Sequence, residues 1–292
     1  FLSQLLLQLL SLYTKKTLAV YLVDLSLEST VNVLCLENKN SMDTHSFPSI
    51  NKNRKIGSLI KTSTVDFPGC ISAALFLHGC NLRCPYCYNI DLVTGKLDEE
   101  EAFSFNEVIA HLEKRKKVLS GFVISGGEPS ISPYLPHLLK VAKEIGYKTK
   151  LDTNGMKPSY LESILANPKI SPDYIALDIK TKPEKYHLLG GAHAPMGEES
   201  AGEKIQRSIE ILASLPSDKR EFRTVLVPGL VNAEDVKEIA HLLPKDASWF
   251  FAEFRNDSCI DPAYNNIEAY EKKELDAIIH QAQLIIPKAA LR

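Results

Sequence analysis

The chain has 292 residues, of which 45% are hydrophobic and 24% are charged, and its formal net charge is −2. This balance is typical of a globular protein with a sizeable core, and the lack of a basic excess argues against a nucleic-acid partner. No apolar stretch reaches the ~20 residues that a membrane-spanning helix needs, so we expect no membrane association.

The first 55 residues differ in character from the rest. A Leu-rich start and an alternating apolar stretch lead into a polar segment, residues 37–55, that is typical of a linker. The first residue is Phe1, and the first methionine is Met42. We therefore expect residues 1–55 to be an extension and linker, and residues 56–292 to form the functional domain. Our hypothesis is that residues 1–41 come from a reading frame extended upstream of Met42; failure to fold by a chain starting at Met42 would contradict it.

From residue 56 onward, short apolar segments alternate with amphipathic ones. Six segments rich in β-branched or aromatic residues predict buried parallel strands. They are Ser72–Leu77, Phe122–Ser125, Thr149–Asp152, Tyr174–Asp178, Phe222–Val227 and Trp249–Phe254.

Helices are predicted between these strands. Ser104 and Glu107 form the pattern of a capping box, and Ser132-Pro133 opens a second helix that Gly146 can end. Further helices fit residues 205–215, 233–243 and 270–285. Six β/α units in ~230 residues predict an α/β fold, namely a partial (β/α)6 barrel open on one side rather than a complete eightfold barrel.

Three of the six cysteines follow the first predicted strand directly. Cys80, Cys84 and Cys87 have the spacing C-x3-C-x2-C and fall at the carboxyl end of the strand, where barrel enzymes place their chemistry. So few cysteines, so clustered, indicate a metal or cluster in a reducing compartment, and we expect a cytoplasmic protein. A [4Fe–4S] cluster normally takes four thiolates, so three would leave one iron open. A structural zinc ion stays possible on spacing alone, with a fourth ligand from His78, Cys70 or Cys259.

The motif C-x3-C-x-aromatic-C, with Tyr86 as the aromatic residue, resembles that of the radical S-adenosylmethionine (SAM) superfamily. The resemblance implies a [4Fe–4S] cluster whose open iron is chelated by the amino and carboxylate groups of SAM. It also implies that the reduced cluster cleaves SAM to methionine and a 5′-deoxyadenosyl radical, which then takes a hydrogen atom from the substrate. Such chemistry belongs to the cofactor, so no catalytic residue beyond the cluster and SAM is expected.

Further motifs lie at successive strand ends. Ser125–Pro129 resembles the superfamily's Gly-Gly-Glu-Pro motif, whose backbone meets the methionine amino group of SAM, and glycines permit a close approach because they lack Cβ. Asp152–Gly155 (Asp-Thr-Asn-Gly) and Asp178–Lys180 (Asp-Ile-Lys) are similar to segments of the enzymes that activate glycyl radical enzymes. The SAM-binding residues that the resemblance implies are Tyr86, Gly126, Gly127, Glu128, Asp152, Thr153, Asn154 and Lys180.

Residues 63–69 contain Val-Asp-Phe-Pro-Gly, which resembles activating proteins of anaerobic ribonucleoside-triphosphate reductase. The resemblance extends over about residues 56–275. It implies a radical SAM activating enzyme that installs a glycyl radical on a partner, with this reductase as the suggested partner and a flavodoxin or ferredoxin as electron donor.

Some points stay open at this stage. A radical SAM enzyme acting on a small molecule, in cofactor or modified-base biosynthesis, is the alternative, and a zinc-stabilised binding module is a second one. The chain has Ala252-Glu253 where the subgroup has Gln-Gln. Arg223 and Arg255 could face a cofactor carboxylate or form ion pairs. Three histidines are expected to be loop or hydrogen-bonded residues rather than ligands: His78, His187 and His193.

Overall fold

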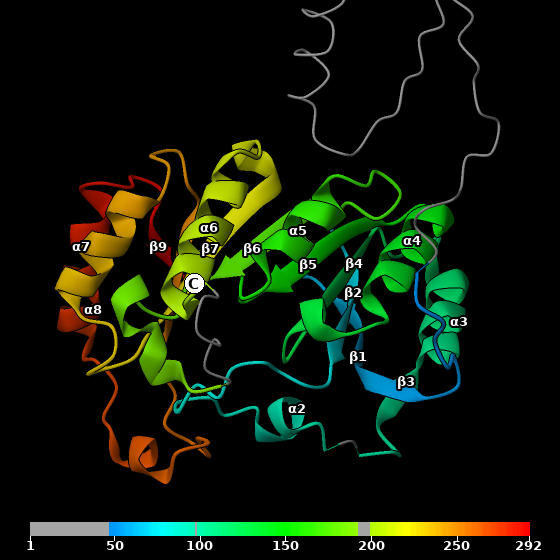
Figure 1. Ribbon diagram of the computed structural model, residues 1–292, viewed down its shortest axis with the longest axis horizontal. Helices are drawn as coiled ribbons and strands as arrows, with labels where there is room; N and C mark the ends of the chain where they lie inside the picture. The colour runs from blue at the N-terminus through cyan, green and yellow to red at the C-terminus, as the bar shows by residue number, and fades with distance from the viewer. Residues whose placement is uncertain (1–46, 97, 192–198) are drawn as a thin grey trace, which may run out of the picture. The chain divides into compact units, whose positions relative to one another are not determined.

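The computed structural model describes residues 47–96, 98–191 and 199–292, and residues 47–292 form one compact unit (Figure 1). Its strands are β1 (Lys55–Ser63), β2 (Ser72–Leu77), β3 (Ala102–Ser104), β4 (Gly121–Gly126), β5 (Lys148–Thr153), β6 (Tyr174–Asp178), β7 (Arg220–Leu226), β8 (Trp249–Glu253) and β9 (Ala290–Leu291). Its α-helices are α2 (Ile90–Thr94), α3 (Phe105–Arg115), α4 (Leu135–Ile145), α5 (Pro158–Leu165), α6 (Ala201–Ala213), α7 (Ala233–Leu242) and α8 (Lys272–Gln283). Short 3₁₀ helices include η1 (Pro129–Ile131), η2 (Pro183–Leu189) and η4 (Pro262–Asn266).

All the strands form one sheet, in the order β3-β1-β2-β4-β5-β6-β7-β8-β9. Neighbours from β2 to β9 are parallel, whereas β1 pairs antiparallel with both β2 and β3. Within the described residues β3 and β9 are the two edges, so the sheet does not close on itself. The predicted α/β fold with an open, partial barrel is confirmed.

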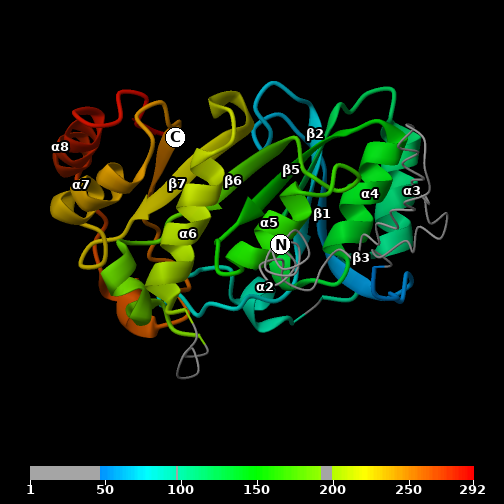
Figure 2. The same cartoon turned by 45° about the horizontal axis from the view of Figure 1, so that its top comes forward.

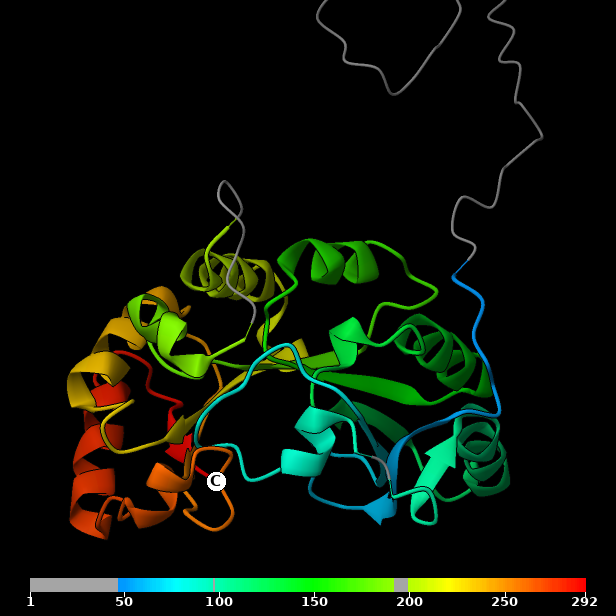
Figure 3. The same ribbon diagram turned by 60° about the horizontal axis from the view of Figure 1, so that its bottom comes forward.

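Helices α3 to α8 lie along one face of the sheet, as Figures 2 and 3 show from two directions. The main hydrophobic core lies between these helices and the strands. Helix α4 illustrates the packing: Leu135, Leu138, Leu139 and Ala142 recur at helical spacing and are all fully buried. The covered face leaves the opposite, inner face of the sheet to carry polar side chains.

A second, small core lies on the inner face, at the amino ends of the strands. Phe67 packs there with Cys70, Ala74 and Val123, and its ring centroid lies 5.9 Å from that of Tyr174. The segment Val-Asp-Phe-Pro-Gly thus closes this end of the inner face, and the polar site develops at the opposite end.

The six predicted parallel strands are confirmed within two residues at each end, but β1, β3, β9, α2 and α5 were not predicted. Strand β1 mixes lysines and serines with apolar residues because it lies near an edge, where Ile60 remains 46% exposed. Helix α4 begins at Leu135 rather than at Ser132, since Ser132 Oγ instead accepts a hydrogen bond from the Tyr134 N–H within the preceding turn (3.3 Å).

The predictions of an N-terminal extension and of no membrane association concern the chain as a whole. Residues 1–46 lie outside the described residues, so the N-terminal extension remains a prediction. None of the helices in the described part of the chain combines the length and the apolar character needed to span a bilayer.

The capping box of α3 gives a test of local stability. Ser104 Oγ accepts the Glu107 N–H (3.3 Å), and a Glu107 carboxylate oxygen accepts the Ser104 N–H (2.7 Å). We expect Ser104→Ala to lower the free energy of unfolding by about 1 kcal/mol, because an orphan N–H at the helix start loses its acceptor. Urea denaturation would measure this. Ser163→Ala, an exposed serine within α5, is the control and should change stability by less than about 0.5 kcal/mol; equal effects of both changes would contradict the capping role.

Candidate functional site

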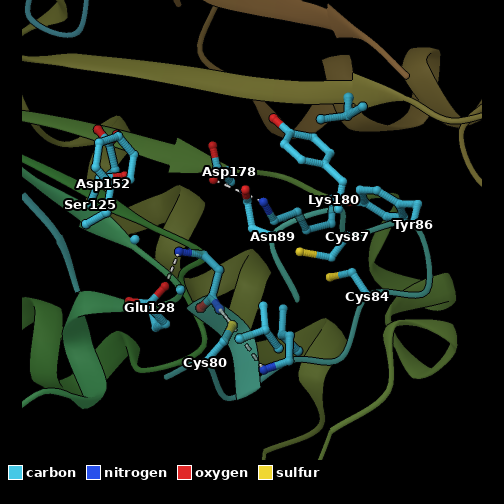
Figure 4. A pocket seen from close by; sticks show the side chains of 18 of the residues that line it. Cys80, Cys84, Tyr86, Cys87, Asn89, Ser125, Glu128, Asp152, Asp178 and Lys180 are labelled. Carbon is cyan, nitrogen blue, oxygen red and sulfur yellow. Dashed lines mark hydrogen bonds and ion pairs between the residues drawn. The ribbon is translucent and has the colours of Figure 1, made fainter. Parts of the chain in front are cut away.

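Cys84 and Cys87 are brought together by a β-turn. The Cys87 N–H donates to the Cys84 carbonyl oxygen at 3.0 Å, and Pro85 occupies the second position of the turn, where its fixed φ is favourable. Cys80 precedes this turn in the same loop. All three cysteines line one pocket at the carboxyl ends of the strands (Figure 4).

The cysteine loop is fastened to other strand ends. The Arg83 N–H donates to the Leu189 carbonyl oxygen (3.1 Å), which ties the loop to η2. The side-chain amide of Asn154 donates to Asn81 Oδ1 (2.8 Å), which ties it to the end of β5. Asn154 therefore holds the loop that carries the cysteines as well as lining the pocket.

The two glycines of the Gly-Gly-Glu-Pro motif are required by the protein's own backbone. Gly126 has φ +122°, and a Cβ there would lie 2.2 Å from the Leu77 carbonyl oxygen. A Cβ on Gly127 would lie 2.1 Å from the carbonyl oxygen of Gly79, immediately before Cys80. Because neither residue has a Cβ, the end of β4 can pack against the backbone at the start of the cysteine loop. This packing requires the glycines whether or not a ligand is bound.

Glu128 is a buried carboxylate with hydrogen bonds inside the protein. Its oxygens accept the Ser130 N–H (3.0 Å), the Thr153 hydroxyl (2.8 Å) and the Asn154 N–H (2.6 Å). Burial nevertheless raises the pKa of Glu128 above its ordinary value. The side chain thus joins the ends of β4 and β5 and fixes the backbone from which Asn154 reaches the cysteine loop.

Charged side chains of β5 and β7 and at the end of β6 form a connected series of ion pairs. Arg223 Nη1 lies 3.2 Å from Asp152 Oδ2, Arg223 Nε lies 2.7 Å from Asp178 Oδ1, and Lys180 Nζ lies 3.0 Å from Asp178 Oδ2. Burial works against ionising Asp178, but the two cations outweigh it and hold its pKa well below the ordinary value. Burial likewise disfavours the charged form of Lys180, yet Asp178 and the neighbouring Cys84 raise its pKa. Lys180 therefore stays a cation beside the cysteines.

The two arginines differ in role. Arg223 is an ion-pair partner of Asp152 and Asp178 on the inner face. Arg255 lines the pocket, pairs with Asp257 at 3.0 Å, and lies over the ring of Tyr88 with 5.2 Å to its centroid. Arg255 is thus the arginine that reaches the pocket wall.

The histidines are not among the residues that line the pocket. His78 lies in the loop after β2, as expected, and neither of its ring nitrogens has a hydrogen-bond partner. His187 Nδ1 lies 2.7 Å from the Glu184 carbonyl oxygen. His193 lies outside the described residues.

All eleven residues singled out from the sequence line this one pocket. They are Cys80, Cys84, Tyr86, Cys87, Gly126, Gly127, Glu128, Asp152, Thr153, Asn154 and Lys180. Other wall residues were not predicted: Phe76, Tyr88, Asn89, Ser125, Val225 and Phe254. Alternate residues of a strand point to the same face of the sheet. Phe76, Ser125 and Val225 could have been predicted in this way, because each lies on the inner face near the carboxyl end of its strand.

The chemistry of the pocket residues bears on an iron–sulfur cluster and SAM as its ligands. Burial raises the pKa of Cys84 to about 12 and also raises that of Cys80, so these thiols need nearby positive charge to become thiolates. Iron ions would supply it. Asp152 lies in the pocket wall with its two carboxylate oxygens in ion pairs, Oδ1 at 3.5 Å from Lys150 Nζ and Oδ2 at 3.2 Å from Arg223 Nη1. The three thiols and the polar and charged side chains around them fit the two groups.

A single closed metal ion fits less well. Among residues 47–96, 98–191 and 199–292 there is no group of three or more His, Cys, Asp or Glu side chains placed to hold one ion. A structural zinc draws four ligands around one centre, whereas each cysteine of a cluster binds a different iron, so the thiols can lie further apart.

The model of the radical SAM superfamily matches residues 75–243, more than half of the chain. The chain belongs to this superfamily and is an enzyme that uses a [4Fe–4S] cluster and SAM.

Relatives and structures agree with this assignment. A protein from Methanocaldococcus jannaschii, named as a candidate glycyl-radical enzyme activating enzyme, is 28% identical over 241 residues, 81% of this chain and 95% of the relative. The pyruvate formate-lyase-activating enzyme of Clostridium pasteurianum is 29% identical over 65% of this chain and 76% of its own. The structure of Streptococcus suis SuiB bound to S-adenosylmethionine has a TM-score of 0.52 at 18% identity, covering 73% of this chain and 48% of that protein, and so supports the fold.

Gly127→Ala tests the coupling between the glycine motif and the cysteine loop. The new Cβ would collide with the Gly79 backbone, which must shift and displace Cys80, so we expect iron bound per chain after anaerobic reconstitution to fall to less than about half. Gly229→Ala is the control: its φ is +82° with nothing within 4 Å of the new Cβ, so it costs about 1–2 kcal/mol of stability and leaves iron binding unchanged. Equal iron contents in the two variants would contradict the coupling.

Proposed function

We propose that the chain activates a glycyl radical enzyme by removing a hydrogen atom from a backbone glycine of that partner. The observation that carries the proposal is the convergence of the cysteine loop, Gly-Gly-Glu-Pro, Asp-Thr-Asn-Gly and Asp-Ile-Lys motifs on one pocket of an open sheet. Relatives that bear the names of activating enzymes support it over much of the chain. The alternative, a small-molecule substrate, is not better supported by the relatives.

In this proposal Cys80, Cys84 and Cys87 hold the cluster. The residues that hold SAM are Tyr86, Gly126, Gly127, Glu128, Asp152, Thr153, Asn154 and Lys180. When bound and reduced, the cluster and SAM supply a 5′-deoxyadenosyl radical. Lys180 places a cation beside the cysteines, where it offsets the negative charge of the thiolates. Asp152, which is held in ion pairs by Lys150 and Arg223, would contribute to the wall of the SAM site.

The remaining wall would exclude water and admit the partner. Phe76, Val225 and Phe254 make part of the pocket apolar, which protects a reactive radical from solvent. Tyr86 is 6% exposed and carries the turn between Cys84 and Cys87. The unclosed sheet leaves room for a segment of another protein to approach.

The finer assignment rests on Val65–Gly69. We infer that the partner is an anaerobic ribonucleoside-triphosphate reductase, because this segment resembles that of activating proteins for this reductase. The same segment packs under the inner face, where the Asp66 carbonyl oxygen accepts a hydrogen bond from the buried Lys150 ammonium (2.7 Å). A flavodoxin or ferredoxin would deliver the electron.

The cysteine assignment predicts the behaviour of two variants. With iron, sulfide, SAM and dithionite under anaerobic conditions, the wild-type protein should form 5′-deoxyadenosine. Cys84→Ala should reduce product to background while the far-ultraviolet circular dichroism spectrum is kept, since the variant lacks one of three ligands. Cys70→Ala, a buried cysteine in the small core at the other end of the inner face, is the matched control and should keep the activity. Cleavage of SAM by Cys84→Ala would contradict the ligand assignment.

The partner assignment is tested by electron paramagnetic resonance. The reduced protein would be mixed with SAM and, in parallel, with an anaerobic ribonucleotide reductase or a pyruvate formate-lyase from the same source. We expect a glycyl radical on the reductase only. A radical only on the lyase would overturn the finer assignment, and 5′-deoxyadenosine without a radical on either would contradict the activating function.

A further inference from the structure

The segment that follows β8 crosses to the cysteine loop. The Ile260 N–H donates to the Cys87 carbonyl oxygen at 3.0 Å, and the Asp261 N–H donates to the Pro85 carbonyl oxygen at 2.9 Å. Four strands separate β8 from β2 in the sheet, so these bonds connect two loops that follow distant strands at the carboxyl ends of the sheet. Figures 1 and 3 both show the orange segment after β8 meeting the cyan loop after β2.

The two carbonyl groups belong to the turn that carries the cysteines. Pro85 lies between Cys84 and Cys87, and the turn's own hydrogen bond joins those two cysteines. Holding both carbonyls therefore restrains the turn against rotation as a unit. The restraint comes from main-chain atoms, so it depends on the shape of the donating segment rather than on the side chains of Ile260 and Asp261.

The donating segment has an unusual backbone. Ser258 is the one non-glycine residue with positive φ (+59°) in the described part of the chain. Such a conformation is maintained only where surrounding contacts impose it. The next residue, Cys259, is 4% exposed, and its N–H donates to Asn265 Oδ1 at 2.8 Å. The amide of Asn265 thus closes this segment into the shape that aims the two N–H groups at the cysteine loop.

We propose that Asn265 is a positioning residue for the iron–sulfur cluster. It acts through the Cys259 N–H and the two main-chain bonds that hold the turn between Cys84 and Cys87. The proposal rests on the cluster-ligand part of the proposed function and is independent of the partner. Without the amide oxygen, the segment relaxes at Ser258, the turn gains freedom, and the cluster is released more readily.

The chain offers a matched control at the adjacent position. Asn266 is also exposed, and its side chain makes no hydrogen bond in the described part of the chain. Wild type, Asn265→Ala, Asn266→Ala and Asn265→Asp would be reconstituted anaerobically, and iron release to a chelator would be followed by absorbance. Asn265→Asp keeps an acceptor oxygen and serves as the rescue.

We expect Asn265→Ala to release iron about 2- to 10-fold faster than wild type, the range that one lost hydrogen bond can produce. Asn266→Ala and Asn265→Asp should release iron at the wild-type rate. Asn265→Ala should lower the melting temperature of the cluster-free protein about as much as Ser104→Ala does, because each change leaves one backbone N–H without its acceptor. The paramagnetic resonance spectrum of the reduced cluster should change in Asn265→Ala alone, and Ser104→Ala, the control for lost stability, should release iron at the wild-type rate.

Wild-type release kinetics in Asn265→Ala would overturn the positioning role, as would equally fast iron release from Ser104→Ala. A wild-type protein that takes up no cluster would instead show that the ligand assignment is wrong. Because the glycyl radical is not measured, failure of the partner assignment leaves this test unaffected.

Discussion

The inner face of the sheet depends on charges that alternate in sign. Lys150 is fully buried and lies 3.2 Å from Glu221 and 3.5 Å from Asp152, and the series continues through Arg223 and Asp178 to the pocket. Taking any one of these charges out of water is costly, and a neighbour of opposite sign repays that cost only with good geometry. The parallel register supplies that geometry, because it places successive strands' side chains side by side on one face.

This charge series runs from the small apolar core at the amino ends of the strands to the cysteine loop at their carboxyl ends. One end is fixed by the bond from Lys150 to the Asp66 carbonyl oxygen, and the other by Lys180 next to Cys84. The Val65–Gly69 segment and the site are therefore parts of one arrangement. The Val-Asp-Phe-Pro-Gly motif, which suggested the activating proteins of the anaerobic reductase from the sequence, therefore also has a structural role. It covers the inner face at the amino ends of the strands, next to the charged side chains.

The sequence predicted the six central strands, because buried strands have strong local signals. The eleven residues that we singled out share one pocket because their motifs lie at strand ends, and their roles as ligands stay a prediction. Other parts depend on contacts distant in sequence. The pairing of Arg223 with Asp152 and Asp178 requires β5, β6 and β7 to be adjacent, so the sequence left its role open. The crossing of residues 260 and 261 to the cysteine loop had no local signal either, since main-chain donors leave no trace in residue type. Strand β1 was missed because it lies next to the edge strand β3 and is partly exposed, so its sequence lacks a continuous apolar run.

The central claim is that three cysteines hold a cluster with one iron open to SAM. Mössbauer spectroscopy of the protein reconstituted with ⁵⁷Fe, before and after SAM is added, tests it most directly. Three cysteine ligands should give a [4Fe–4S] spectrum in which one iron of the four changes its parameters when SAM binds. A spectrum that SAM leaves unaltered, or a protein that takes up one zinc and no iron, would show that the cysteines do not hold such a cluster.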